Sequence, residues 1–256
     1  MGTKTAIAWT DHSQNYWWGC LKVSEECKNC YAETFSKRVG KDIWGPASTT
    51  SRWILGDKNW QNPYKWNKQA QSEQRIHRVF CSSMSDLYED HPEVAETRNR
   101  FFNEVIPETP WLAWQFLTKR PENILTMSPI SWQDKWPDNV WVGTSVGTQA
   151  RAEERIPELL KVPATIRFLS CEPLLEQVDL TPWLPQLQWI ICGGESGPKH
   201  RPFNPDWAKY LRTQCQEANV AYFFKQVGGL YHDSGGSLLD GEEWKAFPMT
   251  GNGTRA

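Results

Sequence analysis

The sequence contains no long hydrophobic run. The apolar stretch nearest its start, "TAIAWT" at residues 5–10, is followed at once by Asp11. A membrane-spanning helix needs about 20 apolar residues, and a secretory signal needs an apolar core of about 7–15. A myristoylation signal is missing as well, because Ala6 stands where that signal requires Ser or Thr. We therefore expect no membrane association and predict a cytoplasmic protein.

An excess of charge of either sign is also missing. Lys and Arg number 28, Asp and Glu number 30, and the formal net charge is −2. No segment forms a basic arm, which excludes proteins that bind duplex nucleic acid through a long series of phosphate contacts. Binding of nucleic acid in a local groove stays compatible with this balance.

A second C-x2-C pair is absent, although the chain has 7 cysteines. In a reducing compartment we expect free thiols or metal ligands rather than disulfides. Cys20, Cys27 and Cys30 are spaced C-x6-C-x2-C. Closed zinc sites use four ligands. Three thiols therefore indicate either an open metal site or a zinc site whose fourth ligand comes from elsewhere, for which His12 and Cys81 are candidates.

The remaining cysteines lie in apolar segments. Cys81, Cys171 and Cys192 fall in strand-like runs and Cys215 in a helix-like one, where cysteine packs as a small hydrophobe. Cys171 is in addition a candidate reactive thiol, because "SCEP" places it beside Glu172.

Short apolar runs alternate with helix-like segments along the chain. Strands are expected at residues 5–10, 78–87, 111–120, 139–147, 164–173, 188–197 and 220–229. Helices are expected at residues 31–39, 92–106, 148–160 and 206–218, with a short one after Pro121. Apolar strands that alternate with helices predict a parallel sheet with covered faces. We expect one domain over residues 1–256, with an irregular insertion at about 40–74 and a polar tail from about 230.

Polar residues follow nearly every expected strand. A closed or nearly closed barrel gathers the ends of all its strands around one mouth, whereas an open sheet has one crevice. The fold class predicted is therefore α/β, a parallel β/α barrel that is partial and has six to seven strands. The residues at its mouth are Ser83, Asp86, Lys119, Arg120, Ser145, Glu172, Glu195 and Lys225.

The cysteine triad follows the first expected strand, so it lies at the same mouth. Three cysteines in this loop of a β/α barrel resemble the radical S-adenosylmethionine superfamily. The usual spacing in that superfamily is C-x3-C-x2-C, and many members have an aromatic residue where this chain has Asn29. A longer loop can still bring three thiolates together.

A second resemblance covers almost the whole chain. The blocks "GCLKVSEECKNCYAET", "SSMSDLYED", "FLTKRPE", "NVWVGTSV", "RFLSCEPLL", "WIICGGESG" and "FFKQ" occur in this order. They resemble an uncharacterised family of phage and bacterial three-cysteine proteins that is grouped with the radical enzymes. That family supplies no substrate.

The resemblance implies a 4Fe-4S cluster held by Cys20, Cys27 and Cys30. It also implies S-adenosylmethionine bound at the open iron and cleaved to a 5′-deoxyadenosyl radical that abstracts hydrogen from substrate. An electron donor such as flavodoxin or ferredoxin is expected, and a partner protein encoded nearby is compatible with this. The phage relatives favour a nucleotide or nucleic acid as substrate.

Position in the barrel assigns roles to the other mouth residues. Ser83, Asp86, Ser145 and Glu172 are the expected contacts of the cofactor. Lys119, Arg120, Glu195 and Lys225 are the expected contacts of the substrate, with the cations suited to phosphate or carboxylate. No catalytic residue is assigned.

A non-catalytic function is the alternative. The triad would then hold zinc as a structural knuckle, and aromatic and cationic side chains would bind single-stranded nucleic acid. Trp44, Trp53, Trp60 and Trp66 lie in polar surroundings that suit such stacking. The H-x-E and P-C-x-x-C pattern of zinc deaminases is absent. The ring of polar strand ends favours the enzyme.

Overall fold

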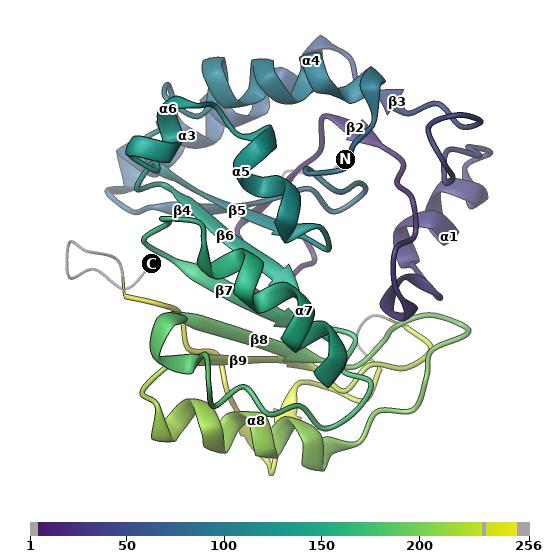
Figure 1. Cartoon of the computed structure of the whole chain (residues 1–256), viewed down its shortest axis with the longest axis vertical. Helices are drawn as coiled ribbons and strands as arrows, with labels where there is room; N and C mark the ends of the chain where they lie inside the picture. Colours follow the sequence, from purple (N-terminus) through teal and green to yellow (C-terminus); the bar gives the residue numbers. More distant parts are fainter. Residues whose placement is uncertain (1–4, 232–233, 250–256) are drawn as a thin grey trace.

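Seven parallel strands form one curled sheet in the computed structural model, which describes residues 5–231 and 234–249 (Figure 1). Their order is β1-β4-β5-β6-β7-β8-β9, and β1 and β9 are the edges, so the barrel is partial. This confirms the predicted fold class. The strands are β1 (His12–Gln14), β4 (His77–Cys81), β5 (Leu112–Thr118), β6 (Val140–Ser145), β7 (Arg167–Cys171), β8 (Trp189–Gly193) and β9 (Ala221–Gln226).

Helices cover the outer face of the sheet (Figure 1). They are α3 (Asn62–Glu73), α4 (Pro92–Arg100) with the π-helical turn η2 (Phe101–Val105), α5 (Ile124–Met127), α6 (Ser131–Asp134), α7 (Gln149–Leu160) and α8 (Pro205–Glu217). Local sequence sets where the longer ones begin. The side chains of His91, Thr148 and Asn204 cap α4, α7 and α8, and proline occupies the first turn of α4 and α8.

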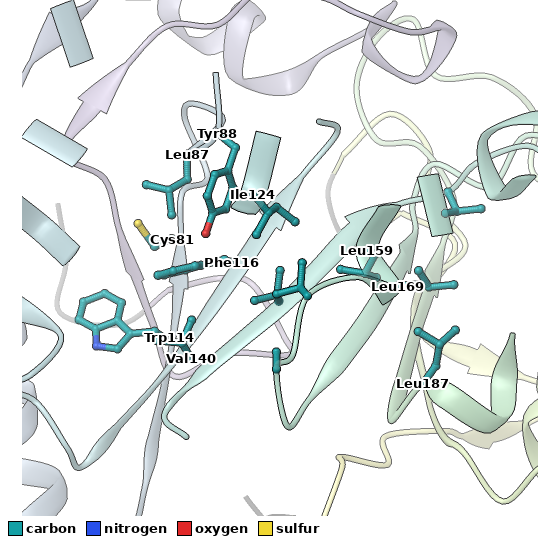
Figure 2. Packing of buried hydrophobic residues seen from close by; sticks show 14 of the residues in the cluster. Cys81, Leu87, Tyr88, Trp114, Phe116, Ile124, Val140, Leu159, Leu169 and Leu187 are labelled. Atoms are coloured by element: carbon teal, nitrogen blue, oxygen red, sulfur yellow. The ribbon is translucent and has the colours of Figure 1, made fainter. Parts of the chain in front are cut away.

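The main hydrophobic core lies between the sheet and these helices. Figure 2 shows Phe116 of β5 beside Tyr88 and Cys81, and the rings of Phe116 and Tyr88 are 6.3 Å apart. Leu159 of α7 and Leu169 of β7 belong to the same buried cluster. Cys81 therefore faces the helices rather than the interior of the barrel.

Aromatic side chains fill the interior of the barrel near the amino ends of the strands. Trp141 and Phe168 form this floor together with Trp189, whose ring centroid lies 5.5 Å from that of Phe168. A Cβ on Gly143 would lie 2.6 Å from the Phe168 ring, so glycine leaves room for it. The apolar floor leaves only the carboxyl ends of the strands for polar chemistry.

The first strand is not where the sequence predicts it. Residues 5–10 contain turns rather than a strand, and β1 begins at His12. Trp9 packs into the barrel floor, 4.6 Å from the ring of Phe80. Asp11 then pairs with Arg78. Tertiary packing of the apolar run, rather than strand pairing, accounts for its hydrophobicity.

The insertion at 40–74 is less irregular than predicted. It contains β3 (Trp53–Ile54), α2 (Asp57–Trp60) and α3, and β3 pairs antiparallel with β2 (Trp17–Trp18). Pro63 stands in the first turn of α3. Ten residues follow it to the end of the helix without another proline or glycine, which permits the helix.

The remaining elements are short. They comprise η1 (Glu25–Cys27), α1 (Tyr31–Arg38), η3 (Pro121–Asn123), η4 (Leu184–Gln186), β10 (Leu238–Leu239) and β11 (Glu242–Glu243). After the β10–β11 hairpin, Phe247 returns to the barrel floor, with its ring 5.3 Å from Phe223. No described helix has the length and hydrophobicity that crossing a membrane requires.

Candidate functional site

A cavity of about 560 Å³ opens at the carboxyl ends of the strands. All of the residues predicted for the site line it. They are Cys20, Cys27, Cys30, Ser83, Asp86, Lys119, Arg120, Ser145, Glu172, Glu195 and Lys225. Parallel topology explains this, because it brings the end of every strand to one side. The roles of the individual residues stay predictions.

The three cysteines belong to one loop, residues 20–30, which we call the cysteine loop. It runs from the end of the β2 segment through η1 to Cys30, which caps α1. Its thiols are free and partly exposed, whereas the remaining cysteines are buried. Cys27 N–H donates to the carbonyl of Ser24 at 3.0 Å, and Cys30 N–H donates to the carbonyl of Cys27 at 3.4 Å. These tight turns place Cys27 and Cys30 on one side of the loop.

Cys20 lies in a charged environment. Its Sγ is 3.4 Å from the carbonyl of Leu21 and 3.8 Å from Nη1 of Arg120. Burial raises the pKa of the Cys20 thiol, the carboxylates of Asp86 and Glu89 raise it further, and Arg120 opposes them. Burial also raises the pKa of the Cys30 thiol. Cys20 and Cys30 therefore favour the protonated form until a cation replaces the proton.

The donor set fits an iron–sulfur cluster in its chemistry. Three soft thiols face one cavity from one loop, and such ligands select iron–sulfur clusters, zinc or copper(I). In residues 5–231 and 234–249, no three His, Cys, Asp or Glu side chains lie close enough together to hold a metal ion as they stand. The fit is therefore in ligand type and in the cavity that the three thiols share, not in the distances between them.

Asp86 has its hydrogen bonds within the protein. It accepts from Oγ1 of Thr118 at 2.7 Å, from the N–H of Lys119 at 3.1 Å and from Nη1 of Arg120 at 2.8 Å. Burial raises the pKa of Asp86, but Arg120 and these hydrogen bonds more than offset that and lower it. Asp86 and Arg120 thus form an ion pair at the base of the cysteine loop.

Glu195 is engaged in the same way. It accepts from Nη2 of Arg201 at 2.7 Å and from Nδ2 of Asn29, in the cysteine loop, at 2.9 Å. The "GGESG" segment that carries it packs against the end of β9, since a Cβ on Gly194 would collide with the carbonyl of Val227. Close approach of two backbones explains this glycine.

Two lysines face the cavity with different partners. Nζ of Lys119 donates to Oγ of Ser145 at 3.1 Å. Nζ of Lys225 lies 2.5 Å from Oε1 of Glu172. Lys119 has no carboxylate within 4.0 Å among the residues described. It is the cation best placed to meet an anionic ligand.

Ser83 lies in the cavity wall just beyond the end of β4. Its hydroxyl accepts from Nδ2 of Asn15 at 2.9 Å and bonds Oγ of Ser13 at 3.0 Å, while its carbonyl accepts from the hydroxyl of Tyr31 at 2.8 Å. Tyr31 follows the third cysteine directly, so its ring borders the mouth. This wall offers small polar groups beside one aromatic face.

Some tryptophans of the 40–74 segment line the cavity, and one lies in the core. Trp44 and Trp66 line the cavity, and Trp66 stacks on His12 with ring centroids 4.4 Å apart. Trp60 is buried against Tyr16, so the prediction that it serves as a stacking surface was wrong. The suggestion of a reactive thiol at Cys171 was wrong too, because this thiol is buried in the core beneath the helices.

Sequence reasoning missed a set of charged residues that hold the cysteine loop. Glu26 lies within the motif itself, but its partner Arg155 is 129 positions away. Arg52, Glu89 and Arg201 likewise contact the loop or its support from distant positions. A carboxylate between two cysteines was the one local signal for this set.

The chain was compared with known families, curated proteins and solved structures. The model of the family described as "protein of unknown function (DUF5131)" matches residues 4–248. No curated protein matches the chain.

Two solved structures of spore photoproduct lyase mutants are similar, one with bound AdoMet and dinucleoside spore photoproduct. They share 12% identity with this chain, with TM-scores of 0.48 and 0.46, and cover 84% and 85% of it. The chain spans 64% of each lyase chain.

Proposed function

The chain belongs to the DUF5131 family of proteins of unknown function, and we propose from the geometry of its site that it is a radical S-adenosylmethionine enzyme. One observation carries the proposal. Three free, partly exposed thiols of a single loop line the same cavity as the polar ends of the parallel strands. A binding module has little use for such a ring of carboxylates and cations around its metal.

Cys20, Cys27 and Cys30 would hold the 4Fe-4S cluster. When bound, the cluster supplies an iron without a protein ligand and one electron, which cleaves S-adenosylmethionine to methionine and a 5′-deoxyadenosyl radical. The surroundings favour three protein ligands over four. Neither candidate for a fourth zinc ligand lines the cavity, because His12 lies against Trp66 and His77, and Cys81 faces the helices.

Ser83, Ser145 and Glu172 are the proposed contacts of S-adenosylmethionine. Each presents a polar group to the cavity from a different part of its wall. Asp86, expected in the same role, is satisfied by Thr118 and Arg120. We therefore assign Asp86 to the support of Arg120 rather than to direct contact.

Lys119 and Lys225 are the proposed contacts of the substrate. Two cations at a polar cavity suit a phosphate or a carboxylate, and a nucleotide or nucleic acid would supply the former. Arg120 and Glu195, expected alongside them, are bonded to the cysteine loop and act on substrate only through it. The electron would come from a flavodoxin or a ferredoxin in the cytoplasm.

Anaerobic reconstitution tests the proposal. The purified chain is treated with iron and sulfide, and iron, sulfide and zinc are counted. About four irons and four sulfides per chain, with a brown absorbance that changes when S-adenosylmethionine is added, are expected. About one zinc per chain, with no colour after reconstitution, would replace the enzyme by a zinc-binding protein.

A further inference from the structure

We propose that ion pairs position the cysteine loop before any metal binds, with Glu26 and Arg155 setting Cys27 and with Arg120 setting Cys20. The inference concerns residues outside the ligand set. It rests on the proposed function only in taking these thiols as the ligands.

Glu26 anchors the middle of the loop, one residue before Cys27. Its side chain is fully buried, at 0% exposure, and pairs with the equally buried Arg155 of α7, Oε2 to Nη1 at 2.6 Å. The N–H of Gly147 donates to Oε1 at 2.6 Å, and the hydroxyl of Ser24 donates to Oε2 at 2.8 Å. One carboxylate therefore ties the loop to the end of β6 and to α7.

The fit around Glu26 is close. A Cβ on Gly147 would lie 3.0 Å from Cγ of Glu26 and would collide with the carbonyl of Pro173. Arg155 also donates to the carbonyl of Ser145 at 2.8 Å, so the same guanidinium holds the strand end that carries a proposed cofactor contact. Movement of Glu26 would thus disturb both Cys27 and Ser145.

Arg120 anchors the start of the loop. Its Nη2 donates to the carbonyl of Leu21 at 2.7 Å, while its Nη1 lies 3.8 Å from Sγ of Cys20. The N–H of Leu21 donates to Oε1 of Glu89 at 2.7 Å. Glu89 is itself held by Arg52, Oε1 to Nη2 at 2.8 Å. Both backbone polar groups of the residue after Cys20 are therefore bonded to buried charges.

These pairs are a poor means of stabilising a fold in general. Burying two charges costs free energy that their attraction only roughly offsets, and apolar residues of the same volume often stabilise as well. Their geometry instead orders an irregular loop that has little apolar packing of its own. A loop that is ordered on folding does not have to be ordered when the metal binds, so metal binding loses less conformational entropy. Residues that orient ligands typically alter metal affinity about 10–100-fold.

The test uses three variants and a control at the end of α7, the helix that carries Arg155. Glu26→Gln keeps volume and removes the charge, Arg155→Lys keeps the charge, and Arg120→Met removes the contacts to Leu21 and Cys20. Lys161→Met is the control, because Lys161 forms an exposed pair with Glu158 on α7. Hydrogen exchange of residues 20–30 and alkylation rates of the three thiols are measured in the metal-free protein. Affinity for Co²⁺ added alone is read from its thiolate charge-transfer band.

Glu26→Gln is expected to speed hydrogen exchange in the loop and alkylation of Cys27 at least tenfold. Arg120→Met is expected to speed hydrogen exchange at the start of the loop by a similar factor, and both variants should weaken Co²⁺ binding about 10–100-fold. Exchange in β4–β9 should stay unchanged. Arg155→Lys keeps the positive charge opposite Glu26, so its effects on exchange and Co²⁺ affinity should be smaller than those of Glu26→Gln. Lys161→Met should match the parent chain. Should Arg155→Lys fail to fold, Glu26→Gln decides alone.

Unchanged exchange, alkylation and Co²⁺ affinity in both Glu26→Gln and Arg120→Met would overturn the inference. A uniform rise in exchange over the sheet would overturn it as well, since the pairs would then serve only stability. A parent chain that takes up no cluster would reject the proposed enzyme. Hydrogen exchange, alkylation and Co²⁺ affinity would still show whether the ion pairs order the loop.

Discussion

Lys225 and Glu172 reach toward each other from the ends of β9 and β7, and Nζ of the lysine lies 2.5 Å from Oε1 of the carboxylate. Both side chains line the cavity and are about one-fifth exposed. The two strands are not neighbours, because β8 lies between them. The pair therefore bridges two strand ends across β8 in the wall of the cavity.

Glu172→Gln is expected to weaken binding of S-adenosylmethionine about tenfold. A hydrogen bond to a charged group contributes about 1.5–3 kcal/mol, and the amide retains part of it. Equilibrium dialysis of the reconstituted protein measures the dissociation constant. Lys225→Met serves as the comparison, because it removes the other half of the pair and should affect substrate more than cofactor. Equal losses of cofactor affinity in both variants would refute the division of roles.

Cys27→Ala should lose nearly all cluster iron while the sheet stays folded. In the proposed site three thiolates are the whole protein ligand set, and no other described cysteine or histidine lines the cavity to replace the missing one. Iron content after reconstitution and the far-ultraviolet circular dichroism spectrum measure the two properties. Cys215→Ala is the matched control, because that thiol is on the buried face of α8, away from the cavity. It should keep iron and lower the free energy of unfolding by about 1–2 kcal/mol. Retention of full iron by Cys27→Ala would exclude the assigned ligands.

Strands β4 to β9 were predictable because each apolar run ends in polar residues, and parallel pairing then determines where those residues meet. What could not be predicted is which charge meets which. Asp86 and Glu195 look like ligand contacts in the sequence, yet each faces an arginine. The partner of Glu195 is six residues away, but that of Asp86 follows a different strand. Such pairing depends on side-chain geometry that strand periodicity does not contain.

Helix α3 and the segment at 5–10 show the other source of error. Tryptophan and asparagine have lower helix propensity and weaken the helical pattern of α3, which packs against β4 and β5. The run at 5–10 is apolar because Trp9 belongs to the barrel floor. In both places tertiary contacts override local preference.

Lys119→Met is expected to weaken nucleotide binding about tenfold and to lower its salt dependence by about one charge. Among the described residues, Nζ of Lys119 donates to the hydroxyl of Ser145 rather than to a carboxylate, so its charge is available to an anion. Fluorescence titration with a labelled oligonucleotide at several salt concentrations gives both quantities. Lys209→Met is the control, since Lys209 of α8 already pairs with a carboxylate, that of Asp240. An unchanged salt slope in Lys119→Met would exclude a phosphate at this position.

Asp11→Asn is expected to lower stability at neutral pH by about 1–3 kcal/mol. Burial raises the pKa of Asp11, but the hydrogen bonds and charge of Arg78, helped by Arg75, more than offset that and lower it to about 2. A lowered folded-state pKa contributes stability above the unfolded value of 3.8. That contribution is lost as pH falls from about 4 toward 2.

Urea unfolding of the parent chain and Asp11→Asn at several pH values measures this difference. The gap between the two free energies of unfolding should close as pH approaches 2. A gap that stays constant between pH 7 and pH 2.5 would show that Asp11 stabilises β1 without its charge.

Gly147→Ala should destabilise the chain by about 1–3 kcal/mol and loosen the cysteine loop together with it. The added Cβ meets the carbonyl of Pro173 and lies 3.0 Å from Cγ of Glu26. Neither backbone nor buried carboxylate can yield without breaking the bond from the Gly147 N–H to Glu26. Gly56→Ala is the matched control, because its Cβ would meet no atom within 4 Å. Thermal unfolding and alkylation of Cys27 are the measurements, and a stable Gly147→Ala with parental alkylation would show that the loop does not depend on this contact.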